Sequence, residues 1–410
     1  MDEKNLYFSV KEAVLRNLGH SCELSDEELK ARIEKELQKR EKSGLISFRE
    51  RSRCAERLFS AFREFGVLQE LMEDEEVTEI LVNGPFRIFY EKHGTLHLFS
   101  NSFSGEEELS DFIQAICAKG NRAVNEAAPI TDTRLPDGSR VNIVLNPISL
   151  DGASLSIRKF SKEPMNMKTL LRYGSLSQEI ALFLKKAVQA GYNIFVSGGT
   201  GSGKTTFLNA LSEYIPADER VITIEDSAEL QLNGVQNLVR LETRTAGFDG
   251  VATIGIRDLI RTALRMRPSR LSGECRGPEA IDLLSANNTG HSGSLGTGHA
   301  NSTKDMLGRL ETMVLMGMEL PVAAIRGQIA SGIDLLVHLG RLRDKSRKML
   351  EIAELEGVFD GEIRLNSLYR FRETGEEKGK IQGTWEKTGE LLHREKWIAA
   401  GFLSEKKTGL

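Results

Sequence analysis

The amino-acid sequence predicts an α/β protein whose larger part is a parallel sheet covered by helices. Three observations lead to this fold class. A complete phosphate-binding loop stands between an apolar strand-like run and a helical run, within residues 193–211. Beyond Ser175, helical patterns and short apolar runs alternate, as they do in parallel sheets. Residues 67–160 instead hold short strand-like runs around one helical stretch, which is typical of a small α+β domain.

The phosphate-binding loop carries the most specific chemistry in the chain. Its glycines let consecutive backbone N–H groups turn toward phosphate oxygens, and the first turn of the following helix adds partial positive charge. Lys204 is expected to reach the β- and γ-phosphates, and the Thr205 hydroxyl to bind Mg²⁺. A glycine-rich turn without a ligand is the alternative, but the flanking strand and helix favour a nucleoside triphosphate site. The predicted nucleotide-binding residues of this loop are Gly198, Gly199, Thr200, Gly201, Ser202, Gly203, Lys204, Thr205 and Thr206.

Length and composition limit the possible classes of protein. The 410 residues can form two or three domains, and 40% hydrophobic and 28% charged residues are typical of a globular chain. A formal net charge of −4 provides no basic field, so we expect no direct nucleic-acid binding. No apolar run has the length of a membrane span and residues 1–4 do not resemble a signal peptide, which predicts a cytoplasmic protein. The widely spaced Cys22, Cys54, Cys117 and Cys275 predict reduced, buried thiols rather than a zinc cluster.

The N-terminal part divides into a helical segment and a small domain. Residues 1–65 are charged and helical in pattern, with a capping box at residues 25–28 and a thin apolar stripe at Leu29, Ile33 and Leu37. The stripe indicates a helix that packs on a neighbour, although a mostly solvated helix fits the pattern equally. Residues 66–160 form the α+β domain, and residues 161–175 are expected to be a linker. In the α+β domain we predict strands over 77–82, 87–90 and 141–145, and a helix over 107–118.

The C-terminal part divides into the domain of the phosphate-binding loop, over residues 176–355, and a C-terminal extension, over residues 356–410. The last 35 or so residues have the least regular pattern. Within them, residues 381–385 fit a last strand at the domain edge better than a partner-binding element. We predict helices over 177–190, 206–211, 256–266 and 278–286, and strands over 193–196, 221–224 and 238–241.

Carboxylates follow two of the expected strands. Glu225 and Asp226 end the strand that comes one crossover after the phosphate-binding loop, where a carboxylate can orient or deprotonate the attacking water. An acidic turn is the alternative. Glu274 follows residues 270–272, in the position where P-loop proteins place a carboxylate on Mg²⁺ or its water.

Histidines and arginines provide further candidates. Residues 289–301 are rich in glycine and serine and include His291 and His299, which can hydrogen-bond a phosphate, although a plain loop is the alternative. Four arginines are candidates for stabilising charge on the γ-phosphate, from the same subunit or from a neighbour, whereas lone arginines usually lie in solvent. These arginines are Arg240, Arg244, Arg265 and Arg267.

As a set, these motifs resemble the secretion ATPases of the type II/type IV superfamily. They are most similar to the CpaF-like branch, the tight-adherence (Flp) pilus assembly ATPases. The resemblance covers roughly residues 66–355. The segments that carry it are 132–141, 155–158, 198–205, 223–226, 263–268, 273–279, 288–291, 297–302, 309–313 and 341–344.

The resemblance implies a RecA-like P-loop NTPase domain, preceded by a small α+β (PAS-like) domain and an N-terminal helical segment. It implies ATP and Mg²⁺ as cofactors, a homo-hexamer, and ATP hydrolysis coupled to domain motion. The implied partners are inner-membrane pilus platform proteins, which would hold the ring at the inner face of the cytoplasmic membrane.

The resemblance also assigns roles by position. Glu225 and Asp226 match the aspartate box, Glu274 ends the Walker B strand and shares the metal with Thr205, and His299 lies in the histidine box. Three arginines match those that the N-terminal domain directs toward the nucleotide, namely Arg134, Arg140 and Arg158. The predicted catalytic residues are Glu225, Glu274, His299, Arg240 and Arg244.

Two positions depart from the family pattern. The Walker B strand is usually an apolar run, whereas Leu271 and Ser272 make a shorter and more polar one, and a shift by one strand residue would move Glu274 by about 3.3 Å. Ser292 stands where the histidine box usually has Asp. The first departure supports an alternative, a nucleotide-gated assembly module with little intrinsic hydrolysis. A conjugative type IV DNA-transfer ATPase, which shares the fold, is another.

Overall fold

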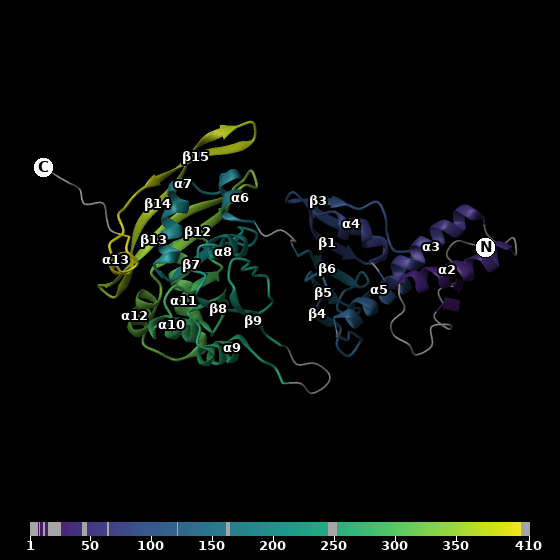
Figure 1. The fold of residues 1–410 in the computed structure, drawn as a ribbon, viewed down its shortest axis with the longest axis horizontal. Coiled ribbons are helices and arrows are strands. Elements are labelled where there is room, and N and C mark those ends of the chain that lie inside the picture. Colours follow the sequence, from purple (N-terminus) through teal and green to yellow (C-terminus); the bar gives the residue numbers. More distant parts are fainter. Residues whose placement is uncertain are drawn as a thin grey trace. The chain divides into compact units, whose positions relative to one another are not determined.

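In the computed structural model the chain forms two compact units, residues 1–162 and residues 163–410 (Figure 1). The structure describes residues 7, 9–10, 13–14, 26–42, 47–63, 65–120, 122–160, 165–244 and 252–402.

The first unit begins with two packed helices, α2 (Asp26–Lys42) and α3 (Phe48–Arg63). Leu29, Ile33 and Leu37 are buried in one cluster with Cys54 and Leu58 of α3. The apolar stripe of α2 therefore packs on a neighbouring helix, as one of the two interpretations of the sequence predicted. Ser25 of the expected capping box lies outside the described residues.

An antiparallel sheet forms the rest of the first unit. Its strand order is β3-β2-β1-β6-β5-β4, and α5 packs Leu109, Ile113 and Ile116 into the core beside it. Cys117 of this helix is a buried free thiol. The predicted helix and strands are present, and β3, β4 and β6 complete the sheet. The elements are η1 (Gly66–Leu68), α4 (Gln69–Glu73), β1 (Val77–Asn83), β2 (Ile88–Lys92), β3 (Thr95–Leu98), α5 (Glu106–Lys119), β4 (Ile130–Arg134), β5 (Arg140–Val144) and β6 (Ser154–Arg158).

The second unit is a mixed sheet with helices on both faces (Figure 1). In the described residues it has nine strands in the order β15-β14-β13-β12-β7-β11-β10-β8-β9. The strands from β12 to β9 pair in parallel, whereas β13, β14 and β15 continue the sheet as antiparallel neighbours. The strands are β7 (Ile194–Gly198), β8 (Arg220–Glu225), β9 (Asn237–Glu242), β10 (Arg270–Glu274), β11 (Leu295–Gly298), β12 (Leu335–Arg341), β13 (Arg347–Phe359), β14 (Glu362–Glu377) and β15 (Lys380–Lys387).

The central strand β7 shows how the two faces are covered. Ile194 and Val196 belong to the cluster that includes residues of α6, α7 and α8, whereas Phe195 belongs to the cluster with α10, α11 and α12. Burial on both faces is typical of parallel strands between helical layers. The helices are α6 (Met167–Arg172), α7 (Gln178–Gln189), α8 (Lys204–Ser212), α9 (Ile256–Ala263), η2 (Leu264–Met266), α10 (Ala280–Asn288), α11 (Thr303–Gly317), α12 (Val322–Gly332) and α13 (Glu395–Ala399).

Two regions are more regular than the sequence patterns indicated. Residues 167–172, inside the expected linker, form α6, whose Met167 and Leu170 are buried in the core. Residues 356–387, inside the expected extension, continue the central sheet, and residues 380–387 form the edge strand β15. Residues 381–385 lie in β15 at the edge of the sheet, as the sequence predicted, whereas β14 is largely exposed and carries charged residues in place of the apolar alternation that identifies a strand.

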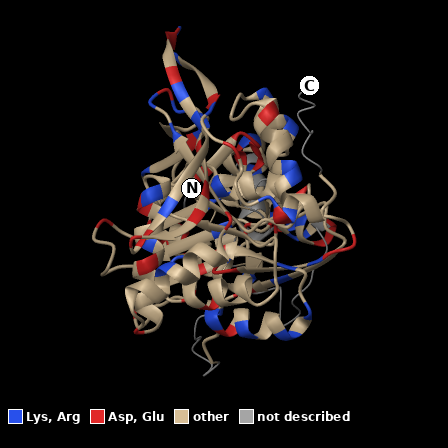
Figure 2. Ribbon diagram, turned by 90° about the vertical axis from the view of Figure 1, so that its left-hand side faces the viewer, with Lys and Arg blue, Asp and Glu red and all other residues tan. Residues whose placement is uncertain are grey.

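No single helix in the described residues is both long and apolar enough to cross a membrane. Only together do α11 and α12 have that length and composition, and they are bent by 118° relative to each other. Figure 2 shows acidic and basic residues interspersed over the ribbon.

Candidate nucleotide-binding site

The phosphate-binding loop joins β7 to α8 and has a tightly specified backbone. Gly203, which precedes α8, has φ 91°, a left-handed conformation that glycine adopts without strain. A Cβ there would also lie 3.3 Å from Cδ of Arg347. The Arg347 side chain donates from Nε to the Gly201 carbonyl at 2.8 Å, and the Ser202 hydroxyl donates to the Gly199 carbonyl at 2.8 Å. These contacts hold the loop in a curled form at the start of α8.

Lys204 lies inside this curl. Its Nζ donates to the carbonyls of Gly198 and Gly199, each at 3.1 Å, and the residue is 8% exposed. A buried ammonium, a glycine-rich curl and the N-terminus of a nine-residue helix form a cradle for phosphate anions. The loop therefore fits a nucleotide phosphate chain, with Thr205 and Thr206 in the first turn of α8.

A row of polar side chains continues from Lys204 across the ends of neighbouring strands. Lys204 Nζ lies 3.4 Å from Nδ1 of His299, which follows β11. The other ring nitrogen, Nε2, lies 3.2 Å from Oε1 of Glu274, the last residue of β10. Arg276 donates from Nη2 to Oε2 of the same carboxylate at 2.5 Å, and its Nη1 lies 4.0 Å from Oδ2 of Asp226, which follows β8. Four strand ends thus contribute to one line of alternating groups.

The imidazole of His299 is neutral in this environment. Burial lowers its pKa, and the nearby charge of Lys204 lowers it further, while Glu274 opposes both effects. A neutral imidazole has one donor and one acceptor nitrogen, so His299 can link a cation on one side to a hydrogen-bonding group on the other.

The short Walker B strand keeps its register in spite of its polar residues. In β10, Ser272 pairs with Thr223 of β8 and with Leu295 of β11. The first residue, Arg270, is only 2% exposed and forms an ion pair with Glu219. Its Nη1 also donates to two carbonyls, those of Val188 at 2.8 Å and Gly293 at 3.2 Å. The buried guanidinium is therefore satisfied, and β10 ends with Glu274 Oε1 at 3.2 Å from His299 Nε2.

Gly273 explains why β10 and β8 come so close before Glu274. A Cβ at this position would overlap the carbonyl oxygen of Ile224. Only glycine permits this approach, which brings the ends of the two strands together. Cys275, the next residue after Glu274, is a buried thiol, as is Cys54 in the first unit. Burial raises the pKa of the Cys275 thiol, which keeps it protonated.

Glu225 is a buried carboxylate directly before Asp226, the last residue of the row. It is 5% exposed, and its Oε2 accepts hydrogen bonds from the backbone N–H groups of Glu229 at 2.7 Å and Leu230 at 2.9 Å. Oε1 has no hydrogen-bond partner among the described residues, and burial raises the pKa of this carboxyl. Through Oε2, Glu225 holds the turn that follows β8, whereas Asp226 meets Arg276.

The candidate arginines of the second unit lie on and after β9 and around η2. Arg240 is exposed on the edge strand β9, four strand positions from β7. Its positive charge favours the ionised form of Glu225 and so opposes the effect of burial on the pKa of that carboxyl. Arg244 donates to the Ala252 carbonyl from Nε at 3.3 Å and from Nη2 at 3.2 Å. Arg265 lies in η2, and Arg267 follows it with φ 56°.

The three candidate arginines of the first unit lie in one row. Arg134 pairs with Arg140 across β4 and β5, and Arg140 pairs with Arg158 across β5 and β6. Directly paired residues in antiparallel strands project to the same face, and like charges in such pairs are unfavourable. The sequence separates these residues by up to 24 positions, and the sheet brings them into neighbouring positions.

The second candidate histidine, His291, lies apart from the row. His291 precedes β11, at the opposite end of this strand from His299, and its Nδ1 lies 3.3 Å from the Ala286 carbonyl. Sequence reasoning gave Arg276 no role, although it stands two residues after Glu274 in a motif that was recognised. It gave none to Arg347 either, because contact with the loop depends on the pairing of β13, which no local pattern reveals.

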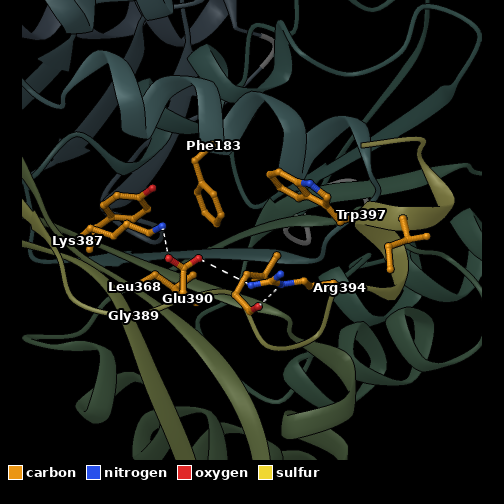
Figure 3. A pocket seen from close by; sticks show the side chains of 10 residues that line it. Phe183, Leu368, Lys387, Gly389, Glu390, Arg394 and Trp397 are labelled. Carbon is orange, nitrogen blue, oxygen red and sulfur yellow. Dashed lines mark hydrogen bonds and ion pairs between the residues drawn. The ribbon is translucent and has the colours of Figure 1, made fainter. Parts of the chain in front are cut away.

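A separate pocket of about 240 Å³ lies beside α13, away from the strand ends that carry the row (Figure 3). Phe183 and Trp397 stack in its wall, with ring centroids 5.8 Å apart. Glu390 pairs with Lys387 at 2.6 Å and with Arg394 at 3.8 Å. Glu390 therefore balances part of the positive charge of Lys387 and Arg394.

Comparison with known proteins identifies the family. The sequence profile described as type II/IV secretion system protein matches residues 62–383. A putative conjugal transfer protein of Mycobacterium tuberculosis is 34% identical over 297 residues, which cover 71% of this chain and 84% of the relative. The type IV secretion system protein PtlH of Bordetella pertussis is 34% identical over 318 residues, which cover 71% and 94%.

Solved structures agree on the fold. The DotB ATPase of Yersinia pseudotuberculosis aligns with a TM-score of 0.52 at 20% identity, over 70% of this chain and 77% of that protein. The DotB ATPase of Legionella pneumophila aligns with a TM-score of 0.50 at 22% identity, over 70% and 78%. The RecA-like α/β fold that the sequence predicted is confirmed. With the profile covering most of its length, the chain belongs to the type II/IV secretion system protein family.

Proposed function

We propose that this protein is an ATPase that converts ATP hydrolysis into domain motion for the assembly of a tight-adherence type IV pilus or a related secretion machine. The observation that carries the proposal is the row from Lys204 through His299 to Glu274, because it places a phosphate-binding ammonium and a water-orienting carboxylate on either side of one neutral imidazole.

Each residue of the row has a task in this proposal. Mg²⁺-ATP, when bound, supplies the phosphoanhydride bond that is cleaved and the charge of the metal. Lys204 would exchange the Gly198 and Gly199 carbonyls for phosphate oxygens, Thr205 would hold the metal directly, and Glu274 would hold it through a water. Glu274 would also orient the attacking water, whose proton Glu225 would accept at Oε1, which has no hydrogen-bond partner among the described residues. His299 keeps Glu274 and Lys204 apart, since a direct contact between them would neutralise both.

The proposal extends to the assembly. A homo-hexamer at the inner face of the cytoplasmic membrane would act on inner-membrane platform proteins of the pilus. The row of Arg134, Arg140 and Arg158 offers three positive charges to a phosphate chain. Arg240 and Arg244, which are exposed in the single chain, would serve the site of a neighbouring subunit. The resemblance to the CpaF-like branch supports the pilus as the destination.

The deciding experiment is steady-state Mg²⁺-ATP hydrolysis by the purified oligomer, compared with Lys204→Ala. Turnover that this substitution abolishes would establish a working ATPase. Lys168→Ala is the matched control, because Lys168 is exposed on α6, and it should behave like the wild type. ATP binding without turnover would instead support the nucleotide-gated assembly module. The ordered register of β10 argues against that alternative.

A DNA-transfer ATPase of a conjugative system is the second candidate function. The observation in its favour is the 34% identity with a putative conjugal transfer protein. The net charge of −4 and the interspersed charges of Figure 2 argue against direct DNA contact. Binding of double-stranded DNA by the purified protein, weakening steeply with added salt, would favour this candidate over pilus assembly.

A further inference from the structure

The loop that carries His299 is fastened to strands on the other side of β7. This loop connects β11 to α11, whereas β12 and β13 lie beyond β7 in the sheet (Figure 1). Thr303, the first residue of α11, is 4% exposed and donates from Oγ1 to Oε2 of Glu351 at 2.6 Å. Glu351 belongs to β13. The segment that follows His299 therefore ends on a carboxylate of a strand that does not contribute to the row at the nucleotide site.

Glu351 is itself held in place by β14. Its Oε1 accepts hydrogen bonds from the Ser367 hydroxyl at 2.9 Å and from Arg370 Nη2 at 2.7 Å. Burial opposes ionisation of this carboxyl, but the hydrogen bonds from Arg370, Thr303 and Ser367 outweigh it, and the pKa lies below its usual value. Charge-assisted hydrogen bonds of this kind are stronger than neutral ones. The carboxylate is thus a fixed anchor for Thr303.

His338 supplies a second fastening from β12. Its Nδ1 lies 3.0 Å from the Ser197 hydroxyl, in a buried contact, and the ring also hydrogen-bonds the backbone of Asn301. Ser197 is the residue before the phosphate-binding loop, and Asn301 is two residues after His299. In the sheet, His338 pairs with Ser197 on one side and with Glu351 on the other. One imidazole therefore connects the P-loop strand to the loop of His299.

We propose that Glu351 and His338 are positioning residues, which hold the His299 loop at its observed separation from Lys204 so that β12, β13 and β14 set the efficiency of the nucleotide site. The proposal rests on the ATPase function proposed above. It adds that contacts from β12, β13 and β14 help to position the His299 loop of that site. Neither side chain is required to touch the nucleotide.

The test uses substitutions at Thr303 in the full-length protein. Thr303→Val keeps the shape of the side chain and removes only the hydroxyl that Glu351 binds, whereas Thr303→Ser keeps the hydroxyl. Thr312→Val is the matched control, because Thr312 lies further along α11, is exposed, and bonds only to the Gly308 carbonyl. Glu351→Asp is a second variant. Its shorter side chain keeps the negative charge but moves the carboxylate away from the Thr303 hydroxyl.

The first measurement is hydrogen–deuterium exchange of the nucleotide-free protein. Thr303→Val and Glu351→Asp should accelerate exchange in peptides that cover residues 299–303, and Thr303→Ser and Thr312→Val should not. Unchanged exchange in Thr303→Val and Glu351→Asp would overturn the proposal. This measurement needs no turnover, so its failure is distinguishable from a failure of the ATPase function, which the Lys204→Ala comparison tests.

The second measurement is a double-mutant cycle on turnover. Thr303→Val should lower kcat by about tenfold, since small misplacements of a catalytic group have effects of this size or larger, with nucleotide affinity unchanged. In a His299→Ala background, Thr303→Val should cause no further loss, because its effect passes through His299. An equal loss in both backgrounds would overturn the positioning role.

Discussion

Arg276 joins two carboxylates that belong to different strand ends, Glu274 at the end of β10 and Asp226 after β8. Its side chain is 48% exposed, so its ion pair with Glu274 contributes little to the stability of the fold. Arg276 instead affects the orientation of the Glu274 carboxylate. One oxygen of Glu274 faces Arg276 and the other faces His299, so Arg276 fixes the direction in which the second oxygen points.

Removal of Arg276 should therefore affect catalysis more than binding or folding. We expect Arg276→Ala to lower kcat by about tenfold, with nucleotide affinity nearly unchanged, because Glu274 can then rotate away from His299. Steady-state kinetics and nucleotide titration together measure this difference. Arg372→Ala, which removes an exposed arginine paired with Glu386 on β14 and β15, is the control. A loss of affinity equal to the loss of turnover would contradict the assignment.

At the scale of elements, β10 shows how a polar sequence can form a central strand. Arg270 takes the place of an apolar residue, and Glu219 and two carbonyls satisfy its guanidinium. An ion pair of this kind is sensitive to the loss of Arg270, because the buried Val188 and Gly293 carbonyls lose their donor and the partly exposed Glu219 loses its charge partner.

We expect Arg270→Ala to lower the free energy of unfolding by about 3–5 kcal/mol, measured by urea denaturation. The control is Arg261→Ala. Arg261 is exposed, with Nε 3.5 Å from Oδ1 of Asp282, and an exposed ion pair of this kind contributes about 1 kcal/mol or less to the free energy of unfolding. Similar losses for both variants would show that the buried pair has no special role.

The elements also show what a sequence reveals and what it conceals. The strands β7 and β8 were predictable as short continuous apolar runs, which are typical of strands buried on both faces, and the helix α7 from its helical period. The strand β11 was not predicted, since Leu295–Gly298 contains two glycines and one threonine. The strand β15 was predicted over 381–385, whereas β14 was not, because its charged residues take the place of an apolar alternation. In the site, the phosphate-binding loop was predictable from local spacing, whereas the contacts of Arg347, His338 and Glu351 depend on pairing between distant strands.

At the scale of the whole molecule, the candidate site residues belong to both compact units. The P-loop row lies in residues 163–410 and the arginine row in residues 1–162. If motion of the units is coupled to hydrolysis, as proposed, the arginines must reach the phosphates at one stage of the cycle.

Arg140, at the centre of its row, should then be required for turnover. We expect Arg140→Ala to lower kcat by at least about tenfold, in the range seen for removal of a charge-stabilising group, with little change in the midpoint of thermal unfolding. ATPase assays and thermal unfolding test the two parts. Arg87→Ala, in the same unit and paired with Asp151 at the surface, is the control. Unchanged turnover in Arg140→Ala would refute the closure of the units around nucleotide.

The mixed sheet of the second unit has a consequence for how the chain acquires its structure. Strands β12 to β15 follow one another along the sequence and pair with their immediate neighbours through short turns, whereas β7, β8, β10 and β11 pair only after long crossovers. Local pairing costs less chain entropy and is faster. The meander of β12 to β15, with Glu351 already in place, would thus form early and serve as the template on which the nucleotide-binding strands assemble last.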